Sequence, residues 1–115
     1  MSVQQNAPNI AILTTVAVTK YKLVTPTGAL CVVSTTRTHL GVTQEDQATV
    51  GLAVPVRMSH AGSCKVTAAV AFAVGALLYY DAAGQVGTTS ASNTAIGVAM
   101  EAASGAGSIV EMMPF

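Results

Sequence analysis

Residues 40–45 read LGVTQE, and 56 positions later residues 96–101 read IGVAME. The same offset relates glycines on both sides of these stretches. Glycines that keep their spacing mark backbone positions that a side chain would disturb. A repeat of this length predicts two copies of one supersecondary unit. The glycines assigned to structural turns or bulges are Gly28 with Gly84, Gly41 with Gly97, and Gly51 with Gly107.

Apolar residues follow the same offset. The matched positions are Val18 with Val74, Val54 with Val110, and Val56 with Met112. Between them, short runs of β-branched residues are separated by turns that contain glycine. Strands are expected at 16–18, 21–24, 30–36, 40–43 and 52–58, and again at 77–80, 85–89, 95–100 and 109–113.

This spacing of strands predicts an all-β protein, a small β-barrel or sandwich made of two duplicated β units. We expect the two units to be related by an approximate twofold. Residues 68–78 alone could form a helix, since alanine and leucine favour helices. Their counterpart, 12–22, is rich in Thr and Val, so both segments are expected to be mainly extended, with a short helical turn near Ala73.

The chain is expected to form a single domain over residues 1–115, with the first β repeat at 14–58 and the second at 70–115. Residues 1–13 read as an extended arm without charge. Such an arm could be a frayed terminus, or it could lie along a neighbouring subunit. The arm residues expected to contact a capsid or a sister subunit are Pro8, Asn9, Ile10, Ile12 and Leu13.

The surface is unusually poor in charge. Charged residues make up 9% of the chain, hydrophobic residues 51%, and the formal net charge is zero. A chain of this kind is expected to cover much of its exterior with copies of itself or with a partner. Its five Lys and Arg residues are scattered and Trp is absent, so we expect no nucleic-acid binding.

We also expect no membrane association and no secretion. The longest apolar stretch without charge, residues 66–80, is interrupted by Thr67 and Gly75 and is shorter than the ~20 residues of a membrane span. No basic region precedes an apolar segment at the N-terminus, so the chain is expected to stay in the cytoplasm where it is made.

Catalytic, cofactor and metal sites are all expected to be absent. Glu45 and Glu101 occupy equivalent repeat positions and could act as paired carboxylates, but each opens a turn, where a carboxylate accepts backbone N–H groups. Cys31 with His39, and His60 with Cys64, have spacings that match no common zinc pattern. We expect both cysteines to be free, buried thiols.

Neither the glycines within the expected strands nor any phosphate-binding motif indicates a ligand site. Gly41 and Gly97 lie inside apolar strands, where glycine usually permits a bulge or a close backbone approach rather than ligand binding. The chain contains no Gly-Lys dipeptide and no G-x-G-x-x-G stretch, so a P-loop and a dinucleotide site are excluded.

Three stretches carry a resemblance to a known family. Residues 73–86 read AVGALLYYDAAGQV, residues 93–103 read NTAIGVAMEAA, and residues 108–112 read SIVEM. Together they resemble a tailed-phage family of capsid decoration, or cement, proteins. The resemblance is strong over residues 50–113 and extends to LGVTQED at 40–46.

The resemblance implies a structural virion protein on the outer capsid surface, made in the host cytoplasm. It would bind the major capsid protein and stabilise the head by bridging capsid subunits. A homo-oligomer is implied, with a trimer favoured and a dimer possible. Two other functions stay open: a small-molecule or glycan-binding β-barrel module, which needs a concave site with converging polar groups, and an enzyme that uses Glu45 and Glu101.

Overall fold

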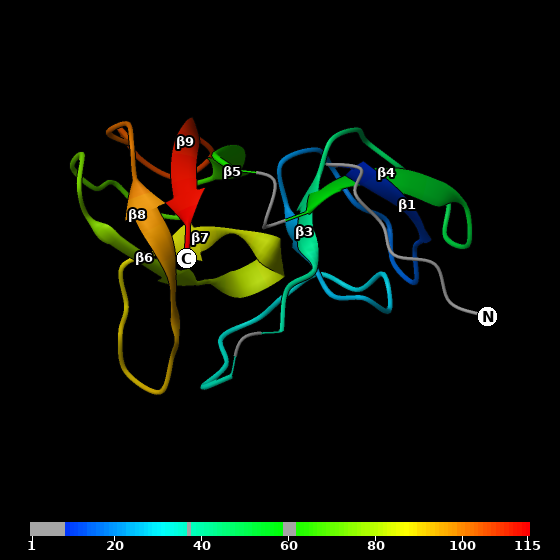
Figure 1. Ribbon diagram of the computed structural model, residues 1–115, viewed down its shortest axis with the longest axis horizontal. Helices are drawn as coiled ribbons and strands as arrows, with labels where there is room; N and C mark the ends of the chain where they lie inside the picture. The colour runs from blue at the N-terminus through cyan, green and yellow to red at the C-terminus, as the bar shows by residue number, and fades with distance from the viewer. Residues whose placement is uncertain (1–8, 37, 59–61) are drawn as a thin grey trace.

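Two antiparallel β-sheets lie side by side in the computed structural model, which describes residues 9–36, 38–58 and 62–115 (Figure 1). The first sheet has the order β1-β4-β3-β2 and consists of β1 (Asn9–Leu13), β4 (Ala53–Met58), β3 (Gly41–Thr43) and β2 (Leu23–Val24). The second has the order β5-β9-β8-β6-β7 and consists of β5 (Cys64–Thr67), β9 (Ile109–Pro114), β8 (Ala95–Ala99), β6 (Leu77–Tyr80) and β7 (Val86–Gly87). The described residues contain no α-helix and one 3-10 turn, Ala82–Gly84, which confirms the all-β class.

The sheets correspond strand for strand. In chain order β1, β2, β3 and β4 take the same places in the first sheet as β5, β6, β8 and β9 in the second. The bounds of β4 and β9 differ by 56 residues at both ends. That the two sheets are copies of one duplicated unit stays a prediction.

A different offset relates the strands that begin each sheet. Ile10 pairs with Val56 in the first sheet, and Cys64 pairs with Met112 in the second. Because Val56 and Met112 correspond, Ile10 corresponds to Cys64, an offset of 54. The same offset follows from Leu23–Val42 with Leu77–Val98, and from Val18–Gln47 with Phe72–Ala103.

The offset changes from 54 to 56 within β6, because Val24 pairs with Leu30 in the first sheet and Tyr80 pairs with Val86 in the second. The register of β6 against β8 shifts between Leu78 and Tyr79, just before the 56-residue offset resumes. The expected match of Val18 with Val74 is therefore wrong, because Val18 corresponds to Phe72 in the ladder.

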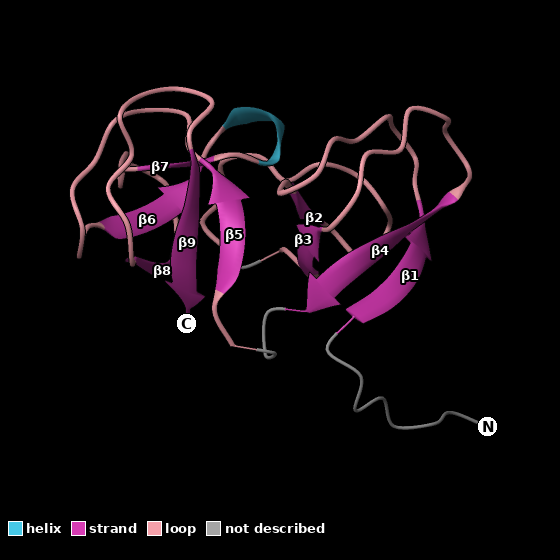
Figure 2. Ribbon diagram, turned by 90° about the horizontal axis from the view of Figure 1, so that it is seen from above, coloured by secondary structure: helices cyan, strands magenta, loops and turns pink. Residues whose placement is uncertain are grey.

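The sheets meet head to tail rather than about an approximate twofold, so that expectation is wrong. Thr67 in β5 donates two hydrogen bonds to the carbonyl of Tyr21, from its backbone N–H at 3.0 Å and its hydroxyl at 3.0 Å. A twofold would also bring Leu13, which corresponds to Thr67, against Gly75, which corresponds to Tyr21. Leu13 instead is 65% exposed, and Figure 2 shows β5 facing the first sheet while β1 lies at its outer edge.

Residues 9–13 form a strand of the first sheet and not an arm outside the fold. β1 pairs with β4 over its whole length, from Asn9 opposite Arg57 to Leu13 opposite Ala53. Alternation along the strand points Ile10 and Ile12 to one face, where they pack against the cluster formed by Val18, Val24, Val54 and Val56. Residues 1–8, including Pro8, lie outside the described part. The second expected unit also begins too late, since β5 starts at Cys64.

The larger hydrophobic core joins the two sheets. Leu23 and Val42 of the first sheet pack in one cluster with Val66, Leu78 and Ile96 of the second. All five side chains are at most 1% exposed. Burial of this apolar surface favours the arrangement of the two sheets as one unit.

The β-branched segment at 30–36 is not a strand, contrary to expectation. Leu30 makes one bridge to Val24, and the chain then runs irregularly to β3. Tyr80 holds the residues that follow this segment: its buried hydroxyl accepts the N–H groups of Thr38 at 2.8 Å and His39 at 3.1 Å and lies 2.6 Å from His39 Nδ1. A side chain of the second sheet thus fixes the chain between this segment and β3.

Gly41 and Gly97 lie where neighbouring strands approach too closely for a side chain. A Cβ atom at Gly41 would overlap the carbonyl oxygen of Arg57, and one at Gly97 would lie 2.7 Å from the carbonyl oxygen of Met113. Residues 68–78 form no helix: they contain isolated bridges at Ala68 and Phe72 and the start of β6, and a hydrogen-bonded turn from Ala73 to Ala76 takes the place of the short helical turn.

Replacing Gly97 with alanine is expected to lower the free energy of unfolding by about 1–3 kcal/mol, because the added methyl group must displace backbone or the Met112 side chain. Gly105→Ala is the matched control, since no atom lies within 4 Å of its Cβ position. Chemical denaturation measures both. Equal stabilities of the two variants would contradict the close approach.

Tyr80→Phe is expected to cost about 1–3 kcal/mol of stability, because it leaves the partly buried N–H groups of Thr38 and His39 without this acceptor. Tyr79→Phe, one residue earlier in β6, provides the comparison. Amide hydrogen exchange at Thr38 and His39 should accelerate only in Tyr80→Phe. Unchanged protection there would show that the hydroxyl does not hold this segment.

Candidate functional site

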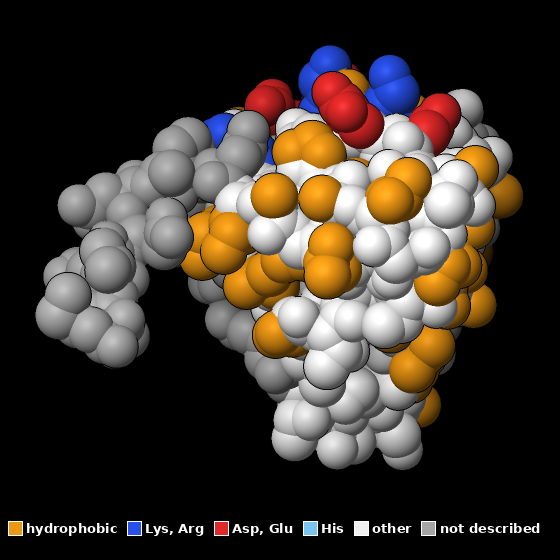
Figure 3. All heavy atoms as spheres, turned by 90° about the vertical axis from the view of Figure 1, so that its right-hand side faces the viewer, with side chains coloured by type: hydrophobic (Ala, Val, Ile, Leu, Met, Phe, Trp, Pro, Cys, Tyr) orange, Lys and Arg blue, Asp and Glu red, His pale blue; other side chains and the backbone are white. Residues whose placement is uncertain are grey.

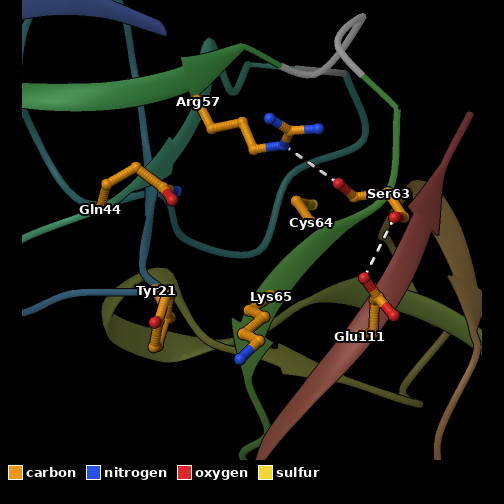
Figure 4. A pocket seen from close by; sticks show the side chains of 7 residues that line it. All are labelled: Tyr21, Gln44, Arg57, Ser63, Cys64, Lys65 and Glu111. Carbon is orange, nitrogen blue, oxygen red and sulfur yellow. Dashed lines mark hydrogen bonds between the residues drawn. The ribbon is translucent and has the colours of Figure 1, made fainter. Parts of the chain in front are cut away.

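A polar cleft of about 330 Å³ lies at the junction of the two sheets (Figure 4). The first sheet and its loops contribute three of its side chains, and the second contributes four. Its lining residues are Tyr21, Gln44, Arg57, Ser63, Cys64, Lys65 and Glu111.

Tyr21 occupies a strained backbone position at one side of the cleft. Its φ of 62° is left-handed, a conformation that costs a residue with a Cβ atom roughly 1–3 kcal/mol. The two hydrogen bonds from Thr67 to its carbonyl fix it there. The ammonium groups of Lys20 and Lys65 lie 5.7 and 5.9 Å from its ring centroid, within the range of cation–π attraction.

Arg57 and Glu111 face each other across Ser63. Arg57 Nε donates to the Ser63 carbonyl at 3.0 Å, and the Ser63 hydroxyl donates to Glu111 Oε1 at 3.1 Å (Figure 4). This chain of bonds connects β4 of the first sheet to β9 of the second. The cleft therefore holds oriented positive and negative groups at the sheet junction.

The cysteine that lines the cleft is a weak nucleophile. Burial raises the pKa of the Cys64 thiol from 9.0 to about 11, with Arg57 lowering it and Glu111 raising it. The thiol is thus protonated at neutral pH, and a protonated thiol is a weak nucleophile. Cys31 is buried elsewhere in the core, and burial likewise raises its pKa to about 11, against a lowering hydrogen bond from Thr38.

The carboxylates singled out in the sequence do not line the cleft. Glu101 Oε1 accepts the backbone N–H of Glu111 at 3.1 Å. Glu45 is exposed in the loop that follows β3, in the other half of the molecule. The structure assigns them to separate loops of the two sheets.

The described residues that were considered as metal ligands have other roles in the structure. Cys31 and Cys64 are free thiols in the core, and His39 bonds to Tyr80. His60 lies outside the described residues. Over 9–36, 38–58 and 62–115 no group of three or more His, Cys, Asp or Glu side chains is arranged to hold a metal ion.

The expected contact residues have unequal exposure. Ile10 and Ile12 are half-buried in their own sheet, whereas Leu13 projects into solvent. Asn9 is the first residue of β1, and Pro8 lies outside the described part. Positive φ angles are found at four of the other expected turn glycines: Gly28, Gly51, Gly84 and Gly107.

The cleft was not predicted from the sequence, although the sequence contains a signal for it. The segment Lys20-Tyr21-Lys22 occupies the same ladder position as Val74-Gly75-Ala76. Both Tyr21 and Gly75 have positive φ. A tyrosine between two lysines at a position where the other half uses glycine is the contrast that could have located the site.

Comparison with known proteins gives a family and a fold. A family model described as phage cement protein matches residues 3–114. The solved structure of the head fiber gp8.5 N base in bacteriophage phi29 is similar at 21% identity, with a TM-score of 0.75, over 93% of this chain and 92% of that one. Among curated proteins no match was found. In the described part of the chain, no helix is long and apolar enough to cross a membrane.

The two buried thiols predict a loss of stability in alkaline solution. Both have folded-state pKa values raised to about 11 from 9.0, so the folded protein binds protons more tightly than the unfolded chain. The contribution of the two thiols to the free energy of unfolding is complete below pH 9, and it is lost as the pH rises from about 9 to about 11. Denaturation at pH 8 and pH 10.5 should show a smaller loss in the Cys31→Ala, Cys64→Ala double variant. An equal loss would contradict the contribution of the thiols.

Proposed function

Since this chain belongs to the phage cement protein family, and is a structural protein of the phage head, we propose that it binds the outer surface of the head and stabilises it by bridging major capsid subunits. The family match over residues 3–114 is the observation that carries this proposal. The fold shared with the head fiber base is in keeping with it.

The described surface supports a protein that works in contact with others. Large hydrophobic side chains that are more than half exposed include Leu13, Val32, Val50, Leu52, Val74 and Phe115. A specific contact of ~800 Å² per partner would cover several of them. We propose that copies of the chain associate with one another on the head, a trimer being favoured, and that Leu13 is among the residues in contact.

We propose no enzymatic role. The family is structural, and the two repeat-related carboxylates, Glu45 and Glu101, lie in loops of different sheets. The cysteine that lines the cleft is held protonated at neutral pH.

A second candidate, binding of a glycan or another small molecule, has one observation in its favour. The cleft is concave, and its polar groups converge from both sheets. The Lys20 and Lys65 ammonium groups, however, lie near the ring of Tyr21, which is the aromatic surface on which a sugar would stack. Capsid binding is therefore the better-supported function.

Purified protein added to expanded heads that lack it should bind in saturable amounts and raise the temperature at which the heads rupture.

The Glu45→Gln, Glu101→Gln double variant should bind within a factor of about two to three of the unmodified chain, because surface substitutions usually change stability by no more than about 0.5 kcal/mol. Sedimentation of heads with bound protein measures occupancy.

Absence of saturable binding would contradict the proposed function. A hydrolytic activity that the double variant abolishes would contradict the structural role. Saturable binding of a glycan, lost in Tyr21→Ala and retained in Tyr79→Ala, would favour the second candidate.

A further inference from the structure

The corner that presents Tyr21 is built a second time in the other sheet. Tyr21 donates its N–H to Thr43 at 2.7 Å, and Gly75 donates to Ala99 at 2.8 Å. Thr43 and Ala99 correspond, since β3 and β8 keep the 56-residue offset. The return bonds, from Thr43 to the Lys22 carbonyl and from Ala99 to the Ala76 carbonyl, are both 2.9 Å. The φ angles of the two corner residues are 62° and 86°.

The two corners carry opposite chemistry. Where the first sheet has Lys20 and Tyr21, the second has Val74 and Gly75, and Val74 is 65% exposed. A glycine suits this backbone position without strain, so the fold itself does not call for a tyrosine there. Two other cleft residues also have apolar counterparts in the second sheet: Gln44 corresponds to Met100 and Arg57 to Met113, both 44% exposed.

On the opposite wall of the junction, too, polar residues have apolar counterparts in the other sheet. Thr67, only 3% exposed because the first sheet covers it, corresponds to Leu13 at the outer edge of the molecule, which is 65% exposed. Two further residues of this wall, Lys65 and Glu111, correspond to Ala11 and Pro55. Every counterpart named here is apolar or glycine.

The backbone of β1 can repeat the bond that β5 makes. Thr14 donates to Leu52, and Pro55, which has no N–H, lies opposite Ala11. Because hydrogen-bonded and non-bonded pairs alternate, the N–H of Leu13 points away from β4, as that of Thr67 points away from β9. Edge strands are natural sites for pairing with another chain. On this edge the backbone of Gly28 already lies against the Leu13 carbonyl and accepts the N–H of Thr15 at 3.2 Å, so the Leu13 N–H is the group that a second chain would use.

The end of the molecule at β1 and β4 is free of charge over most of its visible area. Figure 3 shows hydrophobic and uncharged side chains across this end, with the acidic and basic side chains confined to one rim. An uncharged end loses little hydration when a second protein covers it. At the other end of the chain Val74, Met100 and Met113 are also exposed, and the exposed carboxylate of Glu101 lies next to Met100 in the sequence.

We propose that a second copy of this chain docks head to tail, its β1 edge at Leu13 lying against the Val74–Gly75 corner of the first copy, as β5 lies against Tyr21 within one chain. This inference specifies the interface of the self-association proposed above. The amide of Leu13 would donate to the carbonyl of Gly75. The contact is heterologous, so each copy uses a different surface at its two ends, and successive copies close into a ring or continue as a chain.

A mixing experiment tests this geometry with the full-length chain. Leu13→Asp and Val74→Asp each place a charge on one of the two surfaces, and each should raise the dissociation constant for self-association by about tenfold or more in sedimentation velocity. Val32→Asp is the matched control, because Val32 is 61% exposed and lies outside both surfaces. It should leave self-association unchanged.

An equimolar mixture of Leu13→Asp and Val74→Asp should form a heterodimer with the affinity of the unmodified contact, since each variant keeps the surface that the other has lost. It should form nothing larger. Circular dichroism checks folding, and Leu13→Lys with Val74→Lys repeats the test with the opposite charge.

Two results would overturn the inference. One is an unmodified chain that stays monomeric at all soluble concentrations. The other is a mixture that associates no better than its separate components, as expected when one surface meets its own copy. If heads bind the unmodified chain and all variants alike in either case, the proposed function stands without this interface. If the mixing pattern holds but heads bind nothing, the interface stands and capsid binding fails.

Discussion

The two hydrogen bonds from Thr67 to the carbonyl of Tyr21 are the contact on which the arrangement of the two sheets depends. They hold Tyr21 in a left-handed conformation, and its ring then lies beside the ammonium groups of Lys20 and Lys65. They also bring β5 alongside the first sheet, so that Arg57 reaches the Ser63 carbonyl. The cleft, the shared core and the exposed outer edge at β1 all follow from this head-to-tail junction.

Local constraints in the sequence predicted the fold class. The glycines at 41 and 97 stand where a Cβ atom would meet the neighbouring strand, and this requirement is visible in a single chain as a repeated glycine. Short β-branched runs and glycine-bearing turns predicted an all-β protein, which the structure confirms. Residues 73–112 likewise carried the family resemblance, which the family model confirms.

Long-range pairing could not be predicted in the same way. The offset changes from 54 to 56 within β6, where the register against β8 shifts between Leu78 and Tyr79, and no turn signal marks this change in the sequence. The segment at 30–36 has strand-forming residues but is followed by residues bonded to Tyr80, about 40 positions away. The cleft was missed because its residues come from separate strands that meet only when the two sheets are joined.

The chemistry of the chain is divided between its interior junction and its outer ends. The junction is polar around Tyr21 and Lys65, whereas the corresponding outer positions carry Val74 and Ala11. A monomer would gain nothing from exposing apolar side chains at the positions where its own junction is polar, but an assembled protein would bury them. This division connects the fold to a role in which the chain works as part of a larger particle.

Cryo-electron microscopy of heads saturated with the protein would show directly where it binds. We expect density for the two-sheet fold on the outer surface, in contact with more than one capsid subunit and with Leu13 of one copy beside Val74 of the next. Copies that stand isolated on single capsid subunits, or density confined to the inside of the shell, would contradict it.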